Sequence, residues 1–254
     1  MSSAVQVIPA SDVEAILDVL CDAFFDYPVM RYVLGGEPDY ARRLHTLVGL
    51  FIGARIARED LMLGVHDEAG ALVAAALVNL PGGKIPPPAF ETFRQSVWAE
   101  LGEEERQRYE AYGTASNGFH PDEPHHHLGM IGVRSSHHGQ GLGRVLLDHL
   151  HALVEADPGS GGVSLNTELP RNVELYKYFG YRITGHKMFG SLTPVWTRYG
   201  CHAMTPEGNV VHAFMPRETA NYRIKETWDT LGMRATRSDD TILDGVFVPD
   251  KYIG

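Results

Sequence analysis

The chain of 254 residues has little cysteine, fewer basic than acidic side chains and no long apolar run. Its two cysteines, Cys21 and Cys201, are too few for a disulfide framework and predict free thiols in a reducing cytoplasm. The 22 Lys and Arg against 32 Asp and Glu give a net charge of -10, which excludes a general basic surface for nucleic acid. No apolar run is long enough to span a membrane, and the first residues lack the pattern of a signal peptide.

What remains is the composition of a globular protein, with 44% apolar and 21% charged residues. The length allows one large domain, or one domain of ordinary size with an additional segment. The charge divides unevenly along the chain. Residues 1–186 carry 14 basic and 24 acidic side chains, giving -10, whereas residues 187–254 carry 8 of each, giving 0. This difference favours two parts of different character.

Apolar periodicity and turn residues predict a mixed succession of helices and strands. The expected elements are a strand at 4–9, a helix from Ser11 interrupted by Pro28, a helix at 39–58, a hairpin of strands at 61–66 and 71–79, charged helical material at 89–112, a strand at 127–133, a helix at 141–156, a strand at 163–167, a short helix at 170–180 and a strand at 181–189. Ser11 and Glu14 have the spacing of a capping box. Beyond residue 189 only strand and turn signals follow.

The sequence HHGQGLG at 137–143 places a glycine-rich turn between a predicted strand and a predicted helix. The amides at a helix start bind anions, and Gly139, Gly141 and Gly143 allow close approach and positive φ. A Walker A loop is rejected because Arg144 and Val145 follow where Lys and Ser or Thr are needed. Three interpretations stay open: a dinucleotide fingerprint of imperfect spacing, a loop for the pyrophosphate of coenzyme A, and glycines present for packing alone.

Two motifs in order resemble the GNAT superfamily of acetyl-CoA-dependent N-acetyltransferases. The segment VRSSHHGQGLGRVLLDHL is similar to the family's first motif, Gln/Arg-x-x-Gly-x-Gly/Ala, which falls on His138–Gly143. The segment LNTELPRNVELYKYFGYRITG is similar to the second, with Asn-x-x-x-Tyr on a short helix. The resemblance covers about residues 4–186. It implies an α/β (α+β) fold whose mixed, mostly antiparallel sheet is flanked by helices.

The resemblance also implies acetyl-CoA as co-substrate, with no metal. The residues expected to contact it are Ile131, Val133, His138, Gly139, Gln140, Gly141, Leu142, Gly143, Arg144 and Asn172. The backbone amides of the strand near Ile131 and Val133 would polarise the thioester carbonyl. His138 departs from the family's Gln or Arg and loses the charge and the donors of a guanidinium. Arg144 is expected either to supply positive charge nearby or to be a solvated helix residue.

Two residues are the catalytic candidates. Tyr176 occupies the family's general-acid position, where a phenol would protonate the leaving thiolate. Glu168 follows the strand at 163–167, where a carboxylate could deprotonate the amine through water. His120 and the run at 125–127 are a second base candidate. A metal site on this run is disfavoured, because zinc ligands are usually spaced and no cysteine is near.

The end of the chain resembles another family. From about 181 to 254, and most specifically in GMRATRSDDTILDGVFVP, it is similar to the middle β-domain of acyl-CoA dehydrogenases. That family's flavin contacts and catalytic carboxylate are absent, so no flavin is expected. The predicted domains are therefore 1–186, an acetyltransferase domain, and 187–254, a partial β fragment. Residues 209–216 are expected to complete the acetyltransferase sheet, with 217–254 as a loosely attached hairpin, and its open edges favour self-association.

These patterns predict a cytoplasmic acyltransferase that transfers an acetyl group to a primary amine of a small molecule or peptide. The acidic surface favours a cationic acceptor. The alternatives are a catalytically weak coenzyme A-binding fusion protein, a flavin-associated protein through the tail, and a nicotinamide oxidoreductase. Neither nucleic acid nor a membrane is expected as a partner.

Overall fold

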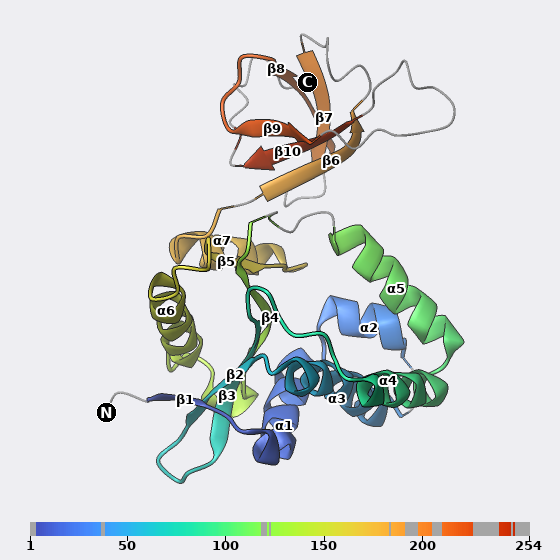
Figure 1. The fold of residues 1–254 in the computed structure, drawn as a ribbon, viewed down its shortest axis with the longest axis vertical. Coiled ribbons are helices and arrows are strands. Elements are labelled where there is room, and N and C mark those ends of the chain that lie inside the picture. The colour runs from blue at the N-terminus through green and yellow to red at the C-terminus, as the bar shows by residue number, and fades with distance from the viewer. Residues whose placement is uncertain are drawn as a thin grey trace. The chain divides into compact units, whose positions relative to one another are not determined.

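The fold was analysed in a computed structural model, in which the chain forms two compact units, residues 1–168 and 169–254 (Figure 1). The structure describes residues 4–36, 39–117, 121, 123–182, 184–190, 198–204, 210–225, 239–244 and 246. In this part of the chain no helix is long and apolar enough to cross a membrane.

The first unit is built on a five-stranded sheet in the order β1-β2-β3-β4-β5. The strands are β1 (Val5–Val7), β2 (Leu61–His66), β3 (Leu72–Asn79), β4 (His126–Val133) and β5 (Val163–Leu165). Neighbours among β1 to β4 are antiparallel, and only β4 and β5 run parallel. The predicted hairpin is confirmed, with Asp67 closing its turn by a backbone bond from its amide to the Ala71 carbonyl.

Helices cover both faces of this sheet, which explains why the first seven residues of β3 are all buried. They are α1 (Val13–Phe24), α2 (Pro28–Leu34), α3 (Tyr40–Arg58), α4 (Pro88–Leu101), α5 (Glu103–Asn117) and α6 (Leu142–Glu155). Figure 1 shows α6 on one side of the sheet and the other helices on the opposite side. Successive residues of β4 reflect this: Gly132 faces α1, whereas Val133 lies beside Gly143 of α6.

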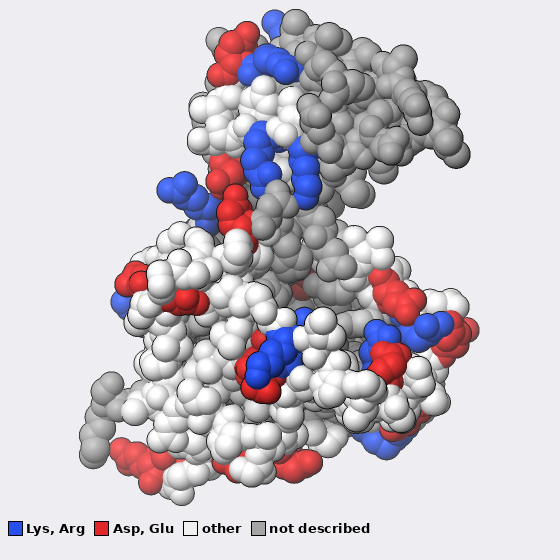
Figure 2. All heavy atoms as spheres, viewed as in Figure 1, with Lys and Arg blue, Asp and Glu red and all other residues white. Residues whose placement is uncertain are grey.

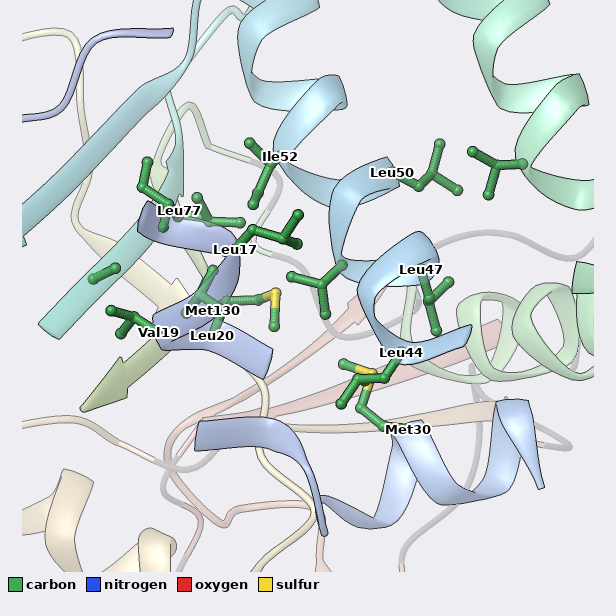
Figure 3. Close-up of a cluster of buried hydrophobic side chains, with 14 of the residues drawn as sticks. Leu17, Val19, Leu20, Met30, Leu44, Leu47, Leu50, Ile52, Leu77 and Met130 are labelled. Carbon is green, nitrogen blue, oxygen red and sulfur yellow. The ribbon is translucent and has the colours of Figure 1, made fainter. Parts of the chain in front are cut away.

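The largest core lies between the sheet and helices α1 to α4 (Figure 3). Leu17 and Leu20 of α1 and Leu44 and Leu47 of α3 are almost completely buried in it, and β4 contributes Met130. These residues recur at helical spacing, so burial of each apolar stripe fixes the orientation of its helix. The mixed α/β architecture predicted from the sequence is confirmed.

The structure corrects one predicted helix start and adds detail at two other helix boundaries. The capping box at Ser11 does not form: α1 begins at Val13, and Ser11 donates to the Asp12 carboxylate instead. The charged stretch at 89–112 is two helices, because Gly102 takes a φ of 117° and ends α4. Pro28 does interrupt the first helix, and it is itself the first residue of α2, where proline's fixed φ is favourable.

In its described residues, the second unit contains α7 (Pro170–Tyr178) and the strands β6 to β10. The strands are β6 (Thr184–Gly190), β7 (Arg198–Met204), β8 (Val210–Pro216), β9 (Tyr222–Lys225) and β10 (Asp239–Asp244). They form a three-stranded sheet, β6-β10-β9, and a β7-β8 pair. Tyr199 and Met215 are buried there against Tyr222, Ile224 and Leu243.

This arrangement corrects two expectations about the tail. Residues 210–216 do not complete the acetyltransferase sheet, because β8 pairs with β7 along its whole length. Residues 217–254 are not a separate hairpin either, since β10 pairs with both β6 and β9. The strand predicted at 181–189 is observed as β6, and it belongs to the tail's own sheet because β10 supplies its hydrogen-bonding edge.

The close approach of α1 to β4 can be tested at Gly132. A Cβ there would lie 2.6 Å from the Ala23 Cβ and 3.2 Å from Leu20, so Gly132→Ala must displace α1. We expect the substitution to lower the free energy of unfolding by about 1–3 kcal/mol, measured by chemical denaturation. Gly143→Ala is the matched control, because its Cβ would lie 3.9 Å from Val133, an ordinary contact. Equal stability of the two variants would contradict this packing.

Candidate active site

The sheet opens between its two parallel strands. β5 pairs with β4 only at His126–Leu128, and Gly129 is then an extra residue in β4, because Leu128 and Met130 oppose the adjacent residues Val78 and Leu77. Such a bulge bends the strand that carries it. Gly129 is exposed, and the rest of β4 extends past the last residue of β5 that pairs with it. The opening exposes one backbone edge of β4.

The direction of the β4 amides follows from a single hydrogen bond. The Arg134 amide donates to the Val73 carbonyl at 2.8 Å, on the side of β3. Because backbone groups alternate in direction along an antiparallel strand, the amides of Ile131 and Val133 point away from β3 toward the opening. The Val133 carbonyl, on that same side, accepts a hydrogen bond from His138 Nε2 at 3.0 Å. The two predicted carbonyl-polarising amides therefore line the open edge.

The glycine-rich turn leads from β4 into α6 with two left-handed residues. Gly139 and Gly141 have φ values of 78° and 75°, and a Cβ at either would meet no atom within 4 Å. Glycine is therefore required there by backbone conformation rather than by packing. Gly141 caps α6 without any side-chain hydrogen bond, so the amides of the first turn are available to an anion.

The side chains of this turn contribute less than its backbone. Leu142 is buried, and His138 is directed back onto β4 by its bond to Val133. Gln140 is exposed, and the Arg144 Nε lies 3.4 Å from Asp148 one helical turn later. Asp22 of α1 accepts the Ser135 amide at 2.5 Å and thereby fixes the start of the turn. The anion-binding capacity thus resides mainly in backbone N–H groups.

Glu168, the predicted base, lies just beyond β5 between two tyrosines. Tyr27 donates to its Oε2 and Tyr112 of α5 to its Oε1, each at 2.7 Å. The Tyr27 oxygen also accepts the Glu168 amide at 3.2 Å. Burial, with the Glu168 bond and charge adding to it, raises the pKa of Tyr112, so this phenol stays a donor at neutral pH. Burial likewise raises the pKa of Tyr27. The exposed carboxylate is therefore held in one orientation.

Asn172 and Tyr176 lie on α7, at the start of the second unit. The Tyr176 ring packs edge-on against Tyr181, with centroids 5.5 Å apart, and its carbonyl accepts the Tyr181 amide. Tyr176, the predicted acid, thus lies on a helix whose end is held by contacts with Tyr181.

The histidine run does not converge on one point. His125 Nδ1 lies 2.8 Å from the Glu123 carbonyl, His126 Nδ1 lies 2.9 Å from Ser160 Oγ, and His127 Nδ1 lies 2.9 Å from Ser164 Oγ. Within the described ranges no group of three metal-ligating side chains comes together. His120 lies outside the described residues. Each described histidine of the run thus has its own structural partner.

Sequence reasoning missed the two tyrosines that hold Glu168. Tyr27 precedes Pro28 in the link between α1 and α2. Tyr112 lies on α5, whose many charged side chains indicate only an exposed helix. No motif marks them, because they meet Glu168 across separations of 141 and 56 residues.

Cys21, one of the two predicted free thiols, is not a reactive one. Burial, with Asp18 adding to it, raises the pKa of the Cys21 thiol to about 12. This makes the thiol a poor nucleophile.

Known acetyltransferases are similar to this chain in sequence and in fold. Residues 94–183 match the family model described as an acetyltransferase (GNAT) domain. A solved structure described as histone acetyltransferase HPA2 and related acetyltransferase, from Corynebacterium glutamicum, is 22% identical with a TM-score of 0.52, covering 87% of this chain and 99% of that one. Residues 94–183 are thus similar to a GNAT acetyltransferase domain, and the solved structure shows that the chain has the fold of that acetyltransferase.

Two curated relatives match a smaller part of the chain. A pigment production hydroxylase from Rhodococcus erythropolis is 33% identical over 82 residues, which are 29% of this chain and 21% of that protein. The oxygenase component of an FADH2-dependent resorcinol hydroxylase from a Rhizobium species is 34% identical over 79 residues, 29% of this chain and 19% of that protein. The match thus spans about a fifth of each relative's length.

The buried His126 predicts a pH dependence of stability. Desolvation lowers its pKa, an effect that Asp157 partly opposes. The unfolded chain therefore binds more protons than the folded one below about pH 6.5, and stability falls as the pH decreases. We expect the free energy of unfolding to decrease from about pH 7 to pH 5 in the native protein, and His126→Asn to reduce that slope. An unchanged slope in the variant, measured by urea denaturation, would contradict the assignment.

Proposed function

We propose that this protein transfers an acetyl group from acetyl-CoA directly to a primary amine, as the family of its domain suggests. The observation that carries the proposal is the opening of β4 from β5 beside the turn at 137–143. Within one short segment, the chain presents the amides of Ile131 and Val133 toward the opening, two glycines with positive φ, and the start of α6 without a side-chain cap. A carboxylate with fixed orientation, Glu168, lies beyond the end of β5.

In this proposal the backbone of 139–144 binds the pyrophosphate of acetyl-CoA at the start of α6, where the helix dipole favours negative charge. Positive φ at Gly139 and Gly141 and the open space over both let the phosphates approach the main chain. The contribution of His138 is small, because its Nε2 is directed to Val133. Asn172 is proposed to contact the pantetheine arm on the strength of its motif position alone.

The reaction then follows from the residues at the opening. Glu168 accepts, through water, a proton from the acceptor ammonium, and the neutral nitrogen attacks the thioester carbonyl carbon. The amides of Ile131 and Val133 donate to the oxygen as it becomes negative. The C–S bond breaks, and Tyr176, assigned this role by its motif position alone, gives its proton to the departing thiolate. The proton that the new amide nitrogen loses passes to solvent, from which the Tyr176 phenolate regains its own. Holding both reactants in line supplies a large share of the rate.

The alternative that keeps most of these features is a coenzyme A-binding protein with weak or no turnover. His138 in place of Gln or Arg supports it, since no guanidinium reaches the phosphates from that position. Both proposals require acetyl-CoA binding, and they differ only in whether Glu168 and Tyr176 affect a rate. A nicotinamide oxidoreductase is disfavoured by the family match of residues 94–183.

The tail is proposed to be a fragment related to the acyl-CoA dehydrogenase β-domain that does not bind flavin. The two hydroxylases are similar to 29% of the chain. One of these relatives is FADH2-dependent by its description. Their similarity supports a shared origin of part of this chain with flavin-dependent proteins. The cytoplasm as the compartment, self-association through tail strands and the absence of nucleic acid or membrane partners stay proposals.

The surface charge does not by itself define the acceptor. On the face seen in Figure 2, acidic side chains gather along the lower edge, whereas elsewhere acidic and basic groups stand close together. Arg106 with Glu103 and Arg108 with Glu105 are such pairs on α5. Several acidic side chains are thus paired with basic ones, and acceptor choice must come from groups at the site.

Ligand binding tests the proposal first. Acetyl-CoA at about 100 times its Kd should stabilise the protein by about 2.7 kcal/mol, whereas FAD and NAD should not. Gly143→Ala should weaken acetyl-CoA binding about tenfold or more, because its Cβ would take up space beside the amides at the start of α6. The apo protein should keep its stability or gain up to about 1 kcal/mol from alanine's helix propensity. No thermal shift with acetyl-CoA would overturn the proposed function.

Turnover tests the roles of Glu168 and its tyrosines. Glu168→Gln should lower kcat by about 10²–10⁴ with unchanged acetyl-CoA binding, measured as release of the coenzyme A thiol. Tyr112→Phe should have a smaller effect, because it removes one of the two donors that orient the carboxylate. Glu174→Gln on the exposed surface of α7 removes the same charge and is the matched control. Equal kcat in Glu168→Gln and the control would exclude Glu168 as the base.

A further inference from the structure

Arg55, in the last turn of α3, is a cation whose partner is missing among the described residues. Its Nε atom is buried and has no hydrogen-bond partner, and no described carboxylate comes within ion-pair distance of its guanidinium. Asp60, the acid that most affects it, accepts the Leu80 amide at 3.0 Å through Oδ1, while its Oδ2 is buried without a partner. Buried donors without partners are rare in proteins, because each has lost its hydrogen bonds to water without replacement.

This guanidinium lies directly against the bulge of β4. A Cβ on Gly129 would lie 2.3 Å from Arg55 Nη2 and 3.5 Å from Cζ. Gly129 is the exposed residue at which β4 and β5 part. Its lack of a side chain is what leaves room for the cation. Arg55 therefore reaches the point at which the sheet opens, from the face covered by α1 to α5.

Helix α5 connects Arg55 with the proposed base. Burial raises the pKa of Tyr109 of α5, and the charge of the nearby Arg55 partly opposes this rise. The Tyr109 ring stacks on Phe51, with ring centroids 5.8 Å apart. Tyr112, three residues later, binds Glu168. Residues three apart on a helix are neighbours on its surface, about 5–6 Å apart at Cβ. The cation and the carboxylate thus flank one turn of the same helix.

We infer that the acceptor is an amine that also carries a carboxylate, with its ammonium directed to Glu168 and its carboxylate bound by Arg55. This inference rests on the proposed function and specifies its substrate class. The planar fork of a guanidinium matches a carboxylate, which would also satisfy the buried Nε. A single positive charge with Asp60 nearby suits a monoanion better than a phosphate dianion. The acceptor expected from net charge alone, a simple cationic amine, would leave Arg55 without a partner.

Acid and amide pairs of the same amine provide the test. A panel of α-, β- and γ-amino acids, each with its neutral amide, is titrated into the native protein and Arg55→Gln in the presence of coenzyme A, with calorimetry as the readout. The native protein should bind the preferred acid at least tenfold more tightly than its amide. Arg55→Gln should lose that difference by weakening the acid and leaving the amide unchanged. With acetyl-CoA, the loss should appear in KM rather than in kcat.

Two further variants distinguish recognition from a structural role. Arg58→Gln removes the same charge from an exposed position one turn along α3 and should retain the preference for the acid. Gly129→Ala should reduce the preference, because its Cβ displaces the guanidinium. Equal binding of acid and amide by the native protein, or equal weakening of both by Arg55→Gln, would overturn the inference. Failure of the proposed function is a separate result, since it appears as no thermal shift with acetyl-CoA.

Discussion

The extra residue at Gly129 is the constraint on which the candidate site depends. β4 must stay paired with β3 along its length while it parts from β5, and a bulge achieves both because it bends one strand without ending its ladder. The parting frees the edge that carries the amides of Ile131 and Val133, and the same glycine leaves room for Arg55. A side chain at this one position would displace the Arg55 guanidinium.

The polar contacts around the opening are long-range and join helices to the ends of strands. Glu168 is oriented by phenols from the α1–α2 link and from α5, and the glycine turn is fixed to α1 through Asp22. Each contact is modest, since a hydrogen bond to a charged group contributes about 1.5–3 kcal/mol at most. Their effect is geometric: groups from distant segments are held within hydrogen-bond distance of one another, which is what a reaction between two bound substrates requires.

The local motifs were predictable because each depends on neighbouring residues. The glycine turn, the helix after it and the hairpin at 61–79 follow from spacing and turn residues alone, and the structure places them within a few residues of the prediction. The capping box failed because the residues around Ser11 adopt a tighter 3-10 turn, in which its hydroxyl bonds to Asp12. Residues 209–216 were assigned to the wrong sheet, because a strand's partner depends on which edge another segment supplies, here β7 for β8.

By itself, then, the sequence determined the chemistry available: a backbone able to bind an anion between a strand and a helix, a carboxylate after β5 and a tyrosine in a family motif. These are properties of short segments, whose conformation their own residues largely fix. Only the tertiary structure decided which groups act together. Tyr27, Tyr112 and Arg55 carry no signal in the chain, and they reach the site because packing of α1, α3 and α5 on the sheet brings them there. Side-chain partners separated by more than fifty residues are set by burial of the core, which no local pattern encodes.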